Sequence, residues 1–568
     1  MKKLSKYLLI LIFVSLASAI VLMSYRPYLG IDDAFIYFVY AKNLAHGHGF
    51  VYNVGGERVE GFTSMLWVLI CSLFYRLFSE NYFRQALVLL NIAMVSFALF
   101  RLIDFLDRRF AGRPVSFPSF PSFCLLAILF VVKGYLDWTV MSLLETGLWS
   151  TCLILITVHL LELCYDPPSQ REALVFGPLL LVLVLTRPES LLLGVVFLVI
   201  RYLLLWRKNR SFISALKGSL LPMLFFAGTF SCLTFFRLRY FGYPYPNTYY
   251  AKVSSSYLYN FKQGFLYFRE FVLTYPVYWI PMVMLVVSLW VCLRGLLSGR
   301  RTVFSFRDNE LAQICIATIS AIALLLPLTV GGDHFALFRI YQPFAPVILL
   351  LLFNGGFIQQ NLFDWDIKRT HLALSRMLLP VFLLPVIYLM NQPKYFRESQ
   401  EPFTSIQHEF YAPFLSRQTC GELNALFDLT PKPSIGRITA GGNAFYYEGA
   451  TVDLMGLNST LMAHADRWKI GIKNHASFNK DAFYKLRPDL VEGEFVDPEH
   501  FVLPANRSAY QFRLNVLKGI FKDAAFLHAY QPVLISHPGD AKAFFTYARM
   551  DYIDLLRRNN YRITFVQS

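Results

Sequence analysis

Long apolar runs recur along most of this 568-residue chain and restrict its fold more than any other feature. Such runs cross bilayers as helices, because a helix satisfies its own backbone hydrogen bonds in lipid. We interpret the first run as an uncleaved helix. The runs lie at about 7–23, 85–103, 120–134, 146–164, 173–186, 190–206, 218–236, 274–295, 311–330, 343–356 and 373–390. They predict a multi-pass α-helical membrane protein, and the composition agrees, with 56% apolar and 16% charged residues.

One further run, 63–78, decides the predicted topology. If it spans, there are twelve spans and Arg101, Arg108 and Arg109 lie outside the cell. If it is a helix at the outer leaflet, there are eleven, and the cytoplasmic segments hold about 20 Lys and Arg in about 85 residues, against about 12 in about 124 for the outer loops. Because cytoplasmic loops are enriched in Lys and Arg, we predict about eleven spans in the cytoplasmic (inner) membrane, with the N-terminus inside.

The chain after about residue 391 has the pattern of a soluble domain. Short β-like runs at 434–439, 451–457 and 532–536 alternate with predicted helices at 418–428 and 541–558. We therefore expect a transmembrane domain over 1–391, with a first outer loop at 25–84. An extracytoplasmic (periplasmic) α/β domain is expected over 392–568.

The net charge of +16 could indicate nucleic acid, anionic lipid or membrane orientation. Most of the excess lies in the predicted cytoplasmic segments, and the soluble domain contributes only about +2, so we interpret it as an orientation signal and expect no nucleic-acid partner. The eight cysteines form no metal-like spacing and are expected to be small apolar core residues.

Two adjacent carboxylates, Asp32 and Asp33, follow the first span and precede an aromatic stretch of helical character. Neighbouring carboxylates near a low-dielectric surface repel each other, so at least one should have a raised pKa. Such a group suits a general base that takes a proton from a hydroxyl. The alternative is that Asp32 caps a helix at the membrane edge.

Polar clusters also end other predicted spans, all on the outer side. They contain Asn247, Thr248 and Lys252; Asp333, His334 and Arg339; Glu145; and Arg187 with Glu189. Ionisable residues at membrane depth are costly, so they pair or serve a site. Lys252 could bind a phosphate or could be a snorkelling membrane anchor. Because these four clusters and the Asp32–Asp33 pair share one side, we predict an active site on the outer face.

Several collinear motifs carry a family resemblance. They are Asp32-Asp-Ala-Phe-Ile, Gly56-Glu-Arg-Val-Glu-Gly61, Leu144-Glu-Thr146, Thr186-Arg-Pro-Glu189, the segment from Phe241 to Lys252, Gly331-Gly-Asp-His334 and Val452-Asp-Leu-Met-Gly-Leu457. Together they resemble multi-pass GT-C glycosyltransferases. The resemblance is strongest to the branch of the mycobacterial terminal arabinofuranosyltransferases and related Gram-negative proteins.

The resemblance implies transfer of a sugar from a polyprenyl-phosphate donor to a cell-envelope glycan or glycolipid on the outer face, in contact with membrane lipid. It assigns the general base to Asp32, with Asp33 as a close second. Donor-phosphate binding falls to Lys252 and Arg58, with His334 and Arg339 as further candidates, since fixed cations stabilise a leaving phosphate. The residues implied to orient sugar or acceptor are Glu60, Glu145, Asn247, Thr248 and Asp333.

Two questions stay open at this point. Asp32, Asp33, Glu60 and Asp333 could assemble a site for a divalent cation, but Lys and Arg alone can hold a single phosphate, so we expect no metal and no cofactor. A transporter or flippase of a lipid-linked sugar would also need polar groups in a helical bundle. The absence of matched repeats in the sequence favours the enzyme over this alternative and over an envelope scaffold.

Overall fold

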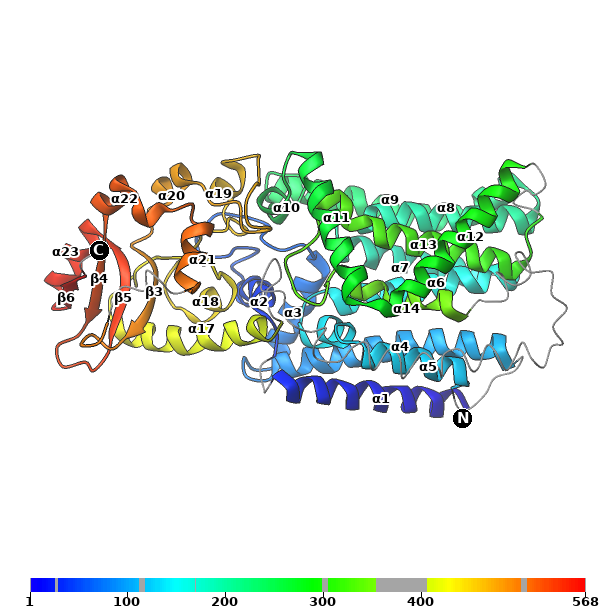
Figure 1. The fold of residues 1–568 in the computed structure, drawn as a ribbon, viewed down its shortest axis with the longest axis horizontal. Coiled ribbons are helices and arrows are strands. Elements are labelled where there is room, and N and C mark those ends of the chain that lie inside the picture. The colour runs from blue at the N-terminus through cyan, green and yellow to red at the C-terminus, as the bar shows by residue number, and fades with distance from the viewer. Residues whose placement is uncertain are drawn as a thin grey trace.

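The computed structural model describes residues 2–25, 29–111, 118–168, 170–298, 305–353, 406–501 and 508–566. Within these residues, a bundle of long helices and a C-terminal domain built on a β-sheet lie end to end (Figure 1). In these ranges, seven helices are long and apolar enough to cross a membrane. They are α1 (Lys2–Tyr25), α4 (Phe83–Ala111), α6 (Thr146–Tyr165), α8 (Ser190–Asn209), α9 (Phe212–Tyr240), α12 (Trp279–Leu297) and α13 (Asp308–Val330).

Three further predicted spans are shorter helical segments. They are α5 (Phe120–Val131), α7 (Gln170–Thr186) and a segment made of η3 (Gln342–Phe344), α14 (Ala345–Leu349) and η4 (Leu350–Phe353). The prediction of a multi-pass helical membrane protein is therefore confirmed. The run at 373–390 and the predicted domain boundary near 391 lie outside the described residues.

The ambiguous run at 63–78 forms α3 (Met65–Leu77), a helix of 13 residues. At 1.5 Å per residue it extends about 20 Å, less than the roughly 30 Å of a hydrocarbon core. It packs against α2 (Asp32–Ala45). The next helix, α4, then runs toward the end of the bundle that is remote from the sheet (Figure 1), and Arg108 and Arg109 lie in its last turn. This arrangement agrees with the interpretation of 63–78 as a helix that does not span, on which the predicted topology rests.

The segment after α9, treated as an outer loop at the sequence level, contains two helices, α10 (Asn247–Lys252) and α11 (Tyr257–Thr274). One face of α11 is buried, with Asn260, Gly264, Tyr267 and Phe271 spaced three or four residues apart, and α11 packs on α13. A 3-10 turn, η2 (Pro276–Tyr278), then leads into α12.

The C-terminal domain has a six-stranded mixed sheet in the order β2-β1-β3-β5-β4-β6. The strands are β1 (Ile435–Arg437), β2 (Thr451–Asp453), β3 (Leu490–Val496), β4 (Tyr530–Ser536), β5 (Ala543–Arg549) and β6 (Arg562–Phe565). β1 pairs in parallel with β2 and β3, and the other pairings are antiparallel. Its helices are α17 (Ile406–Leu426), α18 (Gly441–Tyr446), α19 (Thr460–His464), α20 (Lys480–Leu486), α21 (Ser508–Val516), α22 (Ala524–Ala529) and α23 (Met550–Arg558), with a 3-10 turn η6 (Ile520–Lys522). The predicted α/β domain is confirmed.

The helix predicted at 541–558 is wrong in its first half, because Ala543–Arg549 is the interior strand β5 and α23 begins only at Met550. Phe544 and Phe545 point into different apolar clusters on the two faces of the sheet. A strand buried on both faces has no alternation of apolar and polar residues, so periodicity alone does not separate it from a helix.

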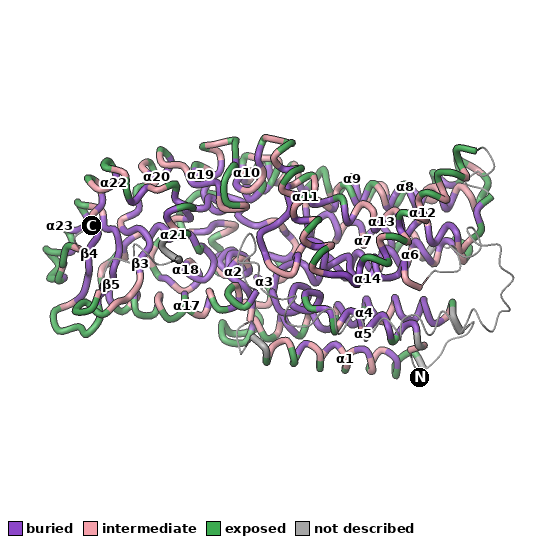
Figure 2. Tube along the Cα trace, in the orientation of Figure 1, coloured by how far each residue is buried: buried purple, intermediate pink, exposed green. Residues whose placement is uncertain are grey.

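The sheet domain is docked on the loop that connects α1 to α4, which we call the first loop. The Asn53 side chain exchanges two hydrogen bonds with the backbone of Thr451, at 2.9 and 3.1 Å. The Tyr40 hydroxyl donates to Asn458 at 3.1 Å. Phe445 of α18 belongs to the same buried cluster as the aromatic residues of α2. The junction between the two domains is therefore packed as part of the bundle's own apolar core, as the purple region between α2 and α18 in Figure 2 illustrates.

Candidate functional site

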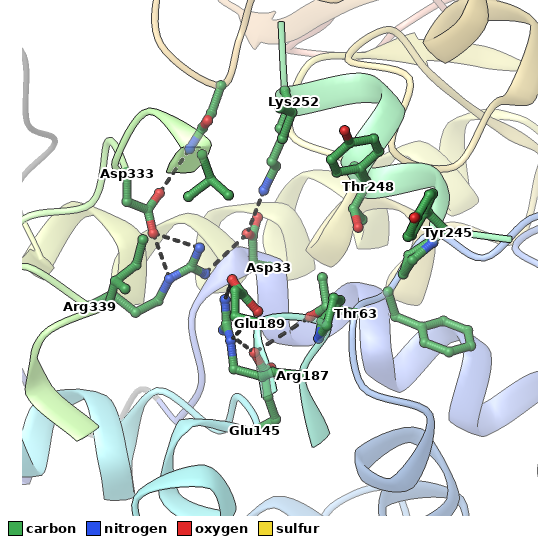
Figure 3. A pocket seen from close by; sticks show the side chains of 18 of the residues that line it. Asp33, Thr63, Glu145, Arg187, Glu189, Tyr245, Thr248, Lys252, Asp333 and Arg339 are labelled. Carbon is green, nitrogen blue, oxygen red and sulfur yellow. Dashed lines mark hydrogen bonds and ion pairs between the residues drawn. The ribbon is translucent and has the colours of Figure 1, made fainter. Parts of the chain in front are cut away.

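A cavity of about 370 Å³ lies where the helical bundle meets the sheet domain (Figure 3). Its walls come from α2, the first loop, the starts of α6 and α8, α10, the end of α13 with the segment after it, and the sheet domain. The polar residues that line it include Asp33, Thr63, Glu145, Arg187, Glu189, Thr248, Lys252, Asp333, Arg339 and Asn474. The predicted polar clusters at the ends of separate spans are thus brought together in one place.

One half of the cavity contains a carboxylate between two cations. Asp33, in the first turn of α2, has its Oδ2 atom 3.5 Å from the Lys252 amine and 3.7 Å from the Arg339 guanidinium. Burial alone would raise the pKa of Asp33, but Lys252 and Arg339 hold it below its ordinary value. Asp33 is therefore an ionised carboxylate in a low-dielectric cavity.

Asp333 fixes Arg339 from the other side. The guanidinium donates to Asp333 at 2.6 and 2.8 Å, and the Asn474 amide of the sheet domain donates to Asp333 at 2.8 Å. Burial alone would raise the pKa of Asp333, but the Arg339 guanidinium keeps that pKa well below its usual range. The chain can turn here because Gly331 and Gly332 follow the end of α13, both with positive φ, and a side chain at Gly332 would collide with Tyr267.

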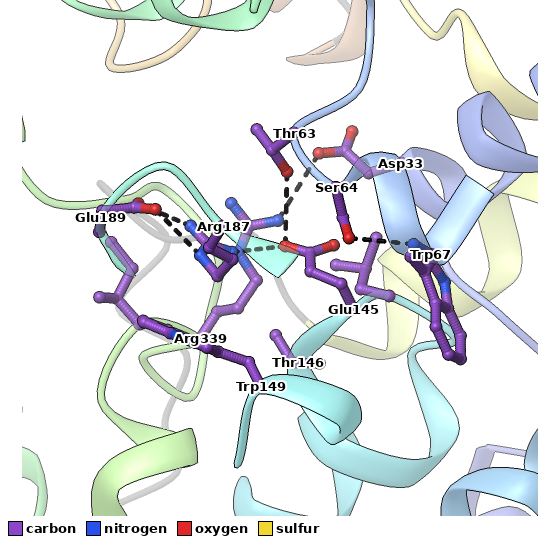
Figure 4. A network of polar contacts seen from close by, with 12 residues as sticks. Asp33, Thr63, Ser64, Trp67, Glu145, Thr146, Trp149, Arg187, Glu189 and Arg339 are labelled. Carbon is purple, nitrogen blue, oxygen red and sulfur yellow. Dashed lines mark hydrogen bonds and ion pairs between the residues drawn. The ribbon is translucent and has the colours of Figure 1, made fainter. Parts of the chain in front are cut away.

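The other half of the cavity is a hydrogen-bonded network around Arg187 (Figure 4). Arg187 binds Glu145 at 2.5 Å and Glu189 at 2.8 Å. The Tyr37 hydroxyl donates to Glu145 at 2.9 Å and lies 2.7 Å from the Thr63 hydroxyl. Burial raises the pKa of Tyr37 well above its ordinary value, so it remains a neutral donor. This half presents a mixed set of donors and acceptors, as a hydroxyl-rich ligand requires.

Asp32, although adjacent to Asp33, does not line the cavity. Its carboxylate accepts hydrogen bonds from the backbone amides of Gly441 and Gly442 at 3.1 and 2.8 Å, at the start of α18. Burial raises the pKa of Asp32 to about 6, against these two bonds. A side chain at Gly441 would clash with the Asp32 backbone. In this structure Asp32 joins the first loop to the sheet domain.

Glu60 and Arg58 lie outside the cavity lining. Glu60 forms a buried two-pronged ion pair with Arg237 at the end of α9, with contacts of 2.8 Å. Arg58 is exposed and lies over the Tyr240 ring at 4.8 Å. Both residues hold the first loop against α9.

Asn247 and His334 also lie behind the cavity wall. The Asn247 amide donates to the carbonyls of Gly456 and Leu457 at 2.8 and 2.9 Å, which ties α10 to the sheet domain. The His334 ring lies 3.0 Å from the Asn474 amide nitrogen and stacks near Phe335. Thr248, the neighbour of Asn247, does line the cavity.

The cavity includes residues to which the sequence analysis assigned no role. Arg187 and Glu189 were recognised as a polar cluster and a motif, but Tyr37, Thr63 and Asn474 were not. Tyr37 and Thr63 lie just after the two first-loop motifs, Asp32-Asp-Ala-Phe-Ile and Gly56–Gly61, so their nearness to those motifs was the only signal for them. Asn474 carried no signal, because it lies in the sheet domain far along the chain.

The carboxylates considered for a cation site are not assembled into one. Asp33 and Asp333 face Arg339, Glu60 binds Arg237, and Asp32 binds backbone amides. Within the described ranges, no group of three or more His, Cys, Asp and Glu side chains is placed to hold a metal ion.

The cavity is lined by apolar as well as polar side chains. The apolar lining includes Leu191 and Leu192 of α8, Leu326 of α13 and Tyr249 of α10. Leu192 and Tyr249 are also exposed on the molecular surface, and α8 is long and apolar enough to span a membrane. The cavity therefore reaches the lipid-facing side and fits an amphipathic ligand with an anionic group beside Lys252 and Arg339.

Fold and site together define a multi-pass membrane protein with a charged cavity under a soluble α/β domain. A comparison with protein-family models finds no match, and neither does one with curated protein sequences. Among solved structures, the chain is similar to the oligosaccharyltransferase AglB of Archaeoglobus fulgidus in complex with an inhibitory peptide and a dolichol-phosphate. That match has a TM-score of 0.46 and 12% identity, over 96% of this chain and 74% of AglB.

The chain is also similar to ArnT of Cupriavidus metallidurans bound to undecaprenyl phosphate. In this match the TM-score is 0.48 and the identity is 12%, over 94% of this chain and 97% of ArnT. Both matches concern the path of the backbone.

Proposed function

We propose that this protein is an integral-membrane glycosyltransferase of the GT-C kind. It moves a sugar from a polyprenyl-phosphate donor to a cell-envelope glycan or glycolipid. The reaction takes place on the outer face of the cytoplasmic membrane, where the sheet domain lies in the periplasm or extracytoplasmic space. The observation that carries the proposal is the cavity itself, in which the Asp33 carboxylate lies between the cations Lys252 and Arg339 and borders a space that reaches the lipid-exposed surface.

In this proposal Asp33 is the general base. Its carboxylate accepts the proton of the acceptor hydroxyl as the hydroxyl oxygen bonds to the anomeric carbon of the sugar. The bond from that carbon to the phosphate oxygen breaks, and the electron pair leaves on the polyprenyl phosphate. Asp33 is favoured over Asp32 because Asp33 lines the cavity and Asp32 is occupied by the amides of α18.

Lys252 and Arg339 are proposed to bind the donor phosphate. Both already face Asp33, so an arriving phosphate competes for them. As the cations turn toward the phosphate, their effect on Asp33 weakens and its pKa rises, which makes the carboxylate a better base when the donor is present. The negative charge of the leaving phosphate is then stabilised by cations that are already in place.

The Glu145–Arg187–Glu189 network, with Tyr37 and Thr63, is proposed to orient sugar hydroxyls. Thr248 and Asp333 contribute from the opposite wall, while Glu60, Asn247, Arg58 and His334 support the walls. The sequence motifs favour an arabinofuranosyltransferase-like specificity, and the sugar transferred is a pentose or a hexose. Lys and Arg satisfy the phosphate in this scheme, so no metal or other cofactor is assigned.

A reconstituted assay separates the transferase from a flippase. Purified protein in vesicles is supplied with polyprenyl-phosphate pentose or hexose and with membrane-derived acceptor, and the lipids are analysed by mass spectrometry. We expect free polyprenyl phosphate to accumulate together with glycosylated acceptor. Movement of intact donor between leaflets, without release of polyprenyl phosphate, would identify a flippase and refute the transferase.

A further inference from the structure

The segment between α19 and α20, residues 466–475, attaches the sheet domain to the start of α11. The Ser255 amide donates to the Arg467 carbonyl at 3.0 Å, and the Tyr259 hydroxyl donates to the Gly471 carbonyl at 3.1 Å. The first part of this segment, residues 466–472, is called the 466–472 loop below. It meets the membrane domain beside α10, whose residue Tyr249 lines the lipid-facing side of the cavity.

Large apolar side chains are exposed on both sides of this contact. In the 466–472 loop, Trp468 is 58% exposed and Ile470 is 54% exposed. At the start of α11, Tyr257 is 89% exposed and Leu258 is 79% exposed. These four residues form what we call the junction patch. Contiguous exposed apolar surface of this kind marks an interaction site.

The junction patch continues along α11. Phe261 and Phe265 are exposed at helical spacing from Tyr257, while the opposite face of α11 is buried against α13. Figure 1 shows α11 crossing the ends of the spanning helices rather than running along them. Figure 2 shows exposed residues where α10 and α11 adjoin the sheet domain. A helix in this orientation lies in the plane of a membrane surface, and its apolar face is available to lipid.

The junction patch adjoins the exposed apolar surface of the helical bundle. Exposed apolar residues on α9 end at Leu238, and the exposed rings of Tyr245 and Tyr249 come next in the chain before Tyr257. Tyr and Trp concentrate where hydrocarbon meets headgroups. Lys262 and Arg467 are exposed close to the patch in sequence and suit anionic headgroups.

We propose that the 466–472 loop and the exposed face of α11 are seated in the headgroup–acyl boundary of the leaflet next to the sheet domain. The occupant of this surface is the lipid bilayer itself. The sheet domain is then held on the membrane beside the mouth of the cavity, by its own Trp468 and Ile470 as well as by its contacts with the first loop.

Depth-sensitive fluorescence tests this placement without measuring activity. The environment-sensitive dye NBD is attached to Ile470→Cys in a background with Cys232→Ser and Cys292→Ser, since these two native cysteines are the ones not buried. The full chain is placed in nanodiscs of phosphatidylglycerol and phosphatidylcholine, with and without brominated acyl chains. Leu555→Cys on α23 is the matched control, an exposed leucine in the same domain but remote from the bundle (Figure 1).

We expect the dye at position 470 to emit at shorter wavelength than at 555 and to lose most of its emission in brominated lipid, while the control keeps its emission. Leu258→Cys should behave like position 470, which provides a second variant if the first fails to fold. Equal, unquenched emission at 470 and 555 would refute the placement. Quenching or energy transfer that depends on two copies in one nanodisc would assign the patch to a second protein chain and also refute it.

Discussion

The two ends of the helical bundle both contain buried ion pairs, but they differ in whether the charges border a cavity. At the remote end, the fully buried Lys6 amine binds Asp107 at 2.7 Å and Asp104 at 3.4 Å. The other Asp107 oxygen accepts from the Ser119 amide at 2.8 Å and the Ser122 hydroxyl at 2.7 Å. Every oxygen of Asp107 is thereby occupied by a nearby protein group.

At the end near the sheet domain, the corresponding carboxylate is held more loosely. Asp33 lies 3.5 Å from Lys252 and 3.7 Å from Arg339, and all three border the cavity. The remote network fixes α1 on α4, whereas the near one leaves charges facing space that a ligand can fill. Burial of charge therefore does not by itself identify a site. The unfilled volume next to the charge does.

The largest effect is expected for Asp33→Asn. Loss of the proposed base should lower turnover by about 10²–10⁴-fold, measured as release of polyprenyl phosphate at saturating donor. Asp32→Asn, which changes a residue outside the cavity, should have a much smaller effect on turnover. Normal turnover in Asp33→Asn would remove the base assignment.

The remote network should respond in stability rather than in ligand binding. Asp107→Ala leaves Lys6 buried without its closest partner and should cost about 3–5 kcal/mol of unfolding free energy, measured by thermal or denaturant unfolding in detergent. The exposed Asp554→Ala is the control and should change stability by less than about 0.5 kcal/mol. Weaker polyprenyl-phosphate binding in folded Asp107→Ala, at unchanged stability, would contradict the distinction between the two ends.

The junction with the sheet domain should be sensitive to pH through Asp32. Its folded-state pKa of about 6 lies above its ordinary value of 3.8, so the folded protein binds the proton more tightly than the unfolded chain. Stability from this group is therefore gained as pH falls from about 6 toward 4 and lost as pH rises, by up to about 3 kcal/mol.

Thermal unfolding of the wild type and Asp32→Asn across this range measures the effect. Glu60, whose pKa burial raises to about 7, adds a slope of the same sign, so the informative quantity is the difference between the two proteins. An identical pH dependence in both would show that Asp32 does not titrate as described.

Lys252 should affect donor affinity more modestly. Lys252→Ala removes one of two cations beside the proposed phosphate position, and we expect about tenfold weaker binding of polyprenyl phosphate, or about 1.4 kcal/mol, by native mass spectrometry. Lys485→Ala, an exposed lysine on α20, is the matched control. Equal affinities for the two variants would show that the phosphate binds away from Lys252.

The smallest effect is expected for Arg58→Ala. This residue lies over the Tyr240 ring outside the cavity, so its removal should cost about 0.5–1 kcal/mol of stability and leave polyprenyl-phosphate affinity unchanged. A clear loss of affinity would favour the phosphate role that the sequence motifs imply over the position described here.

The sequence was sufficient to predict the helical bundle and the gathering of polar clusters at one end of it. Hydropathy and charge asymmetry are properties of whole segments, so they can be read without knowing how the segments pack. It was insufficient where distant packing decides. Asp32 and Asp33 point about 100° apart on one helix, and only the position of α18 determines which faces the cavity. The Phe544–Phe545 pair gave no sign of β5, since both faces of that strand are buried.

The contact of Asn474 with Asp333 has a consequence for biosynthesis. Asp33 and the first loop are synthesised before most of the spans, whereas Asn474 emerges after all the other polar residues of the cavity. A nascent chain therefore inserts its spans while the cavity still lacks one wall. Only the folding of the sheet domain onto α2 completes that wall, which ties maturation of the site to synthesis of the sheet domain.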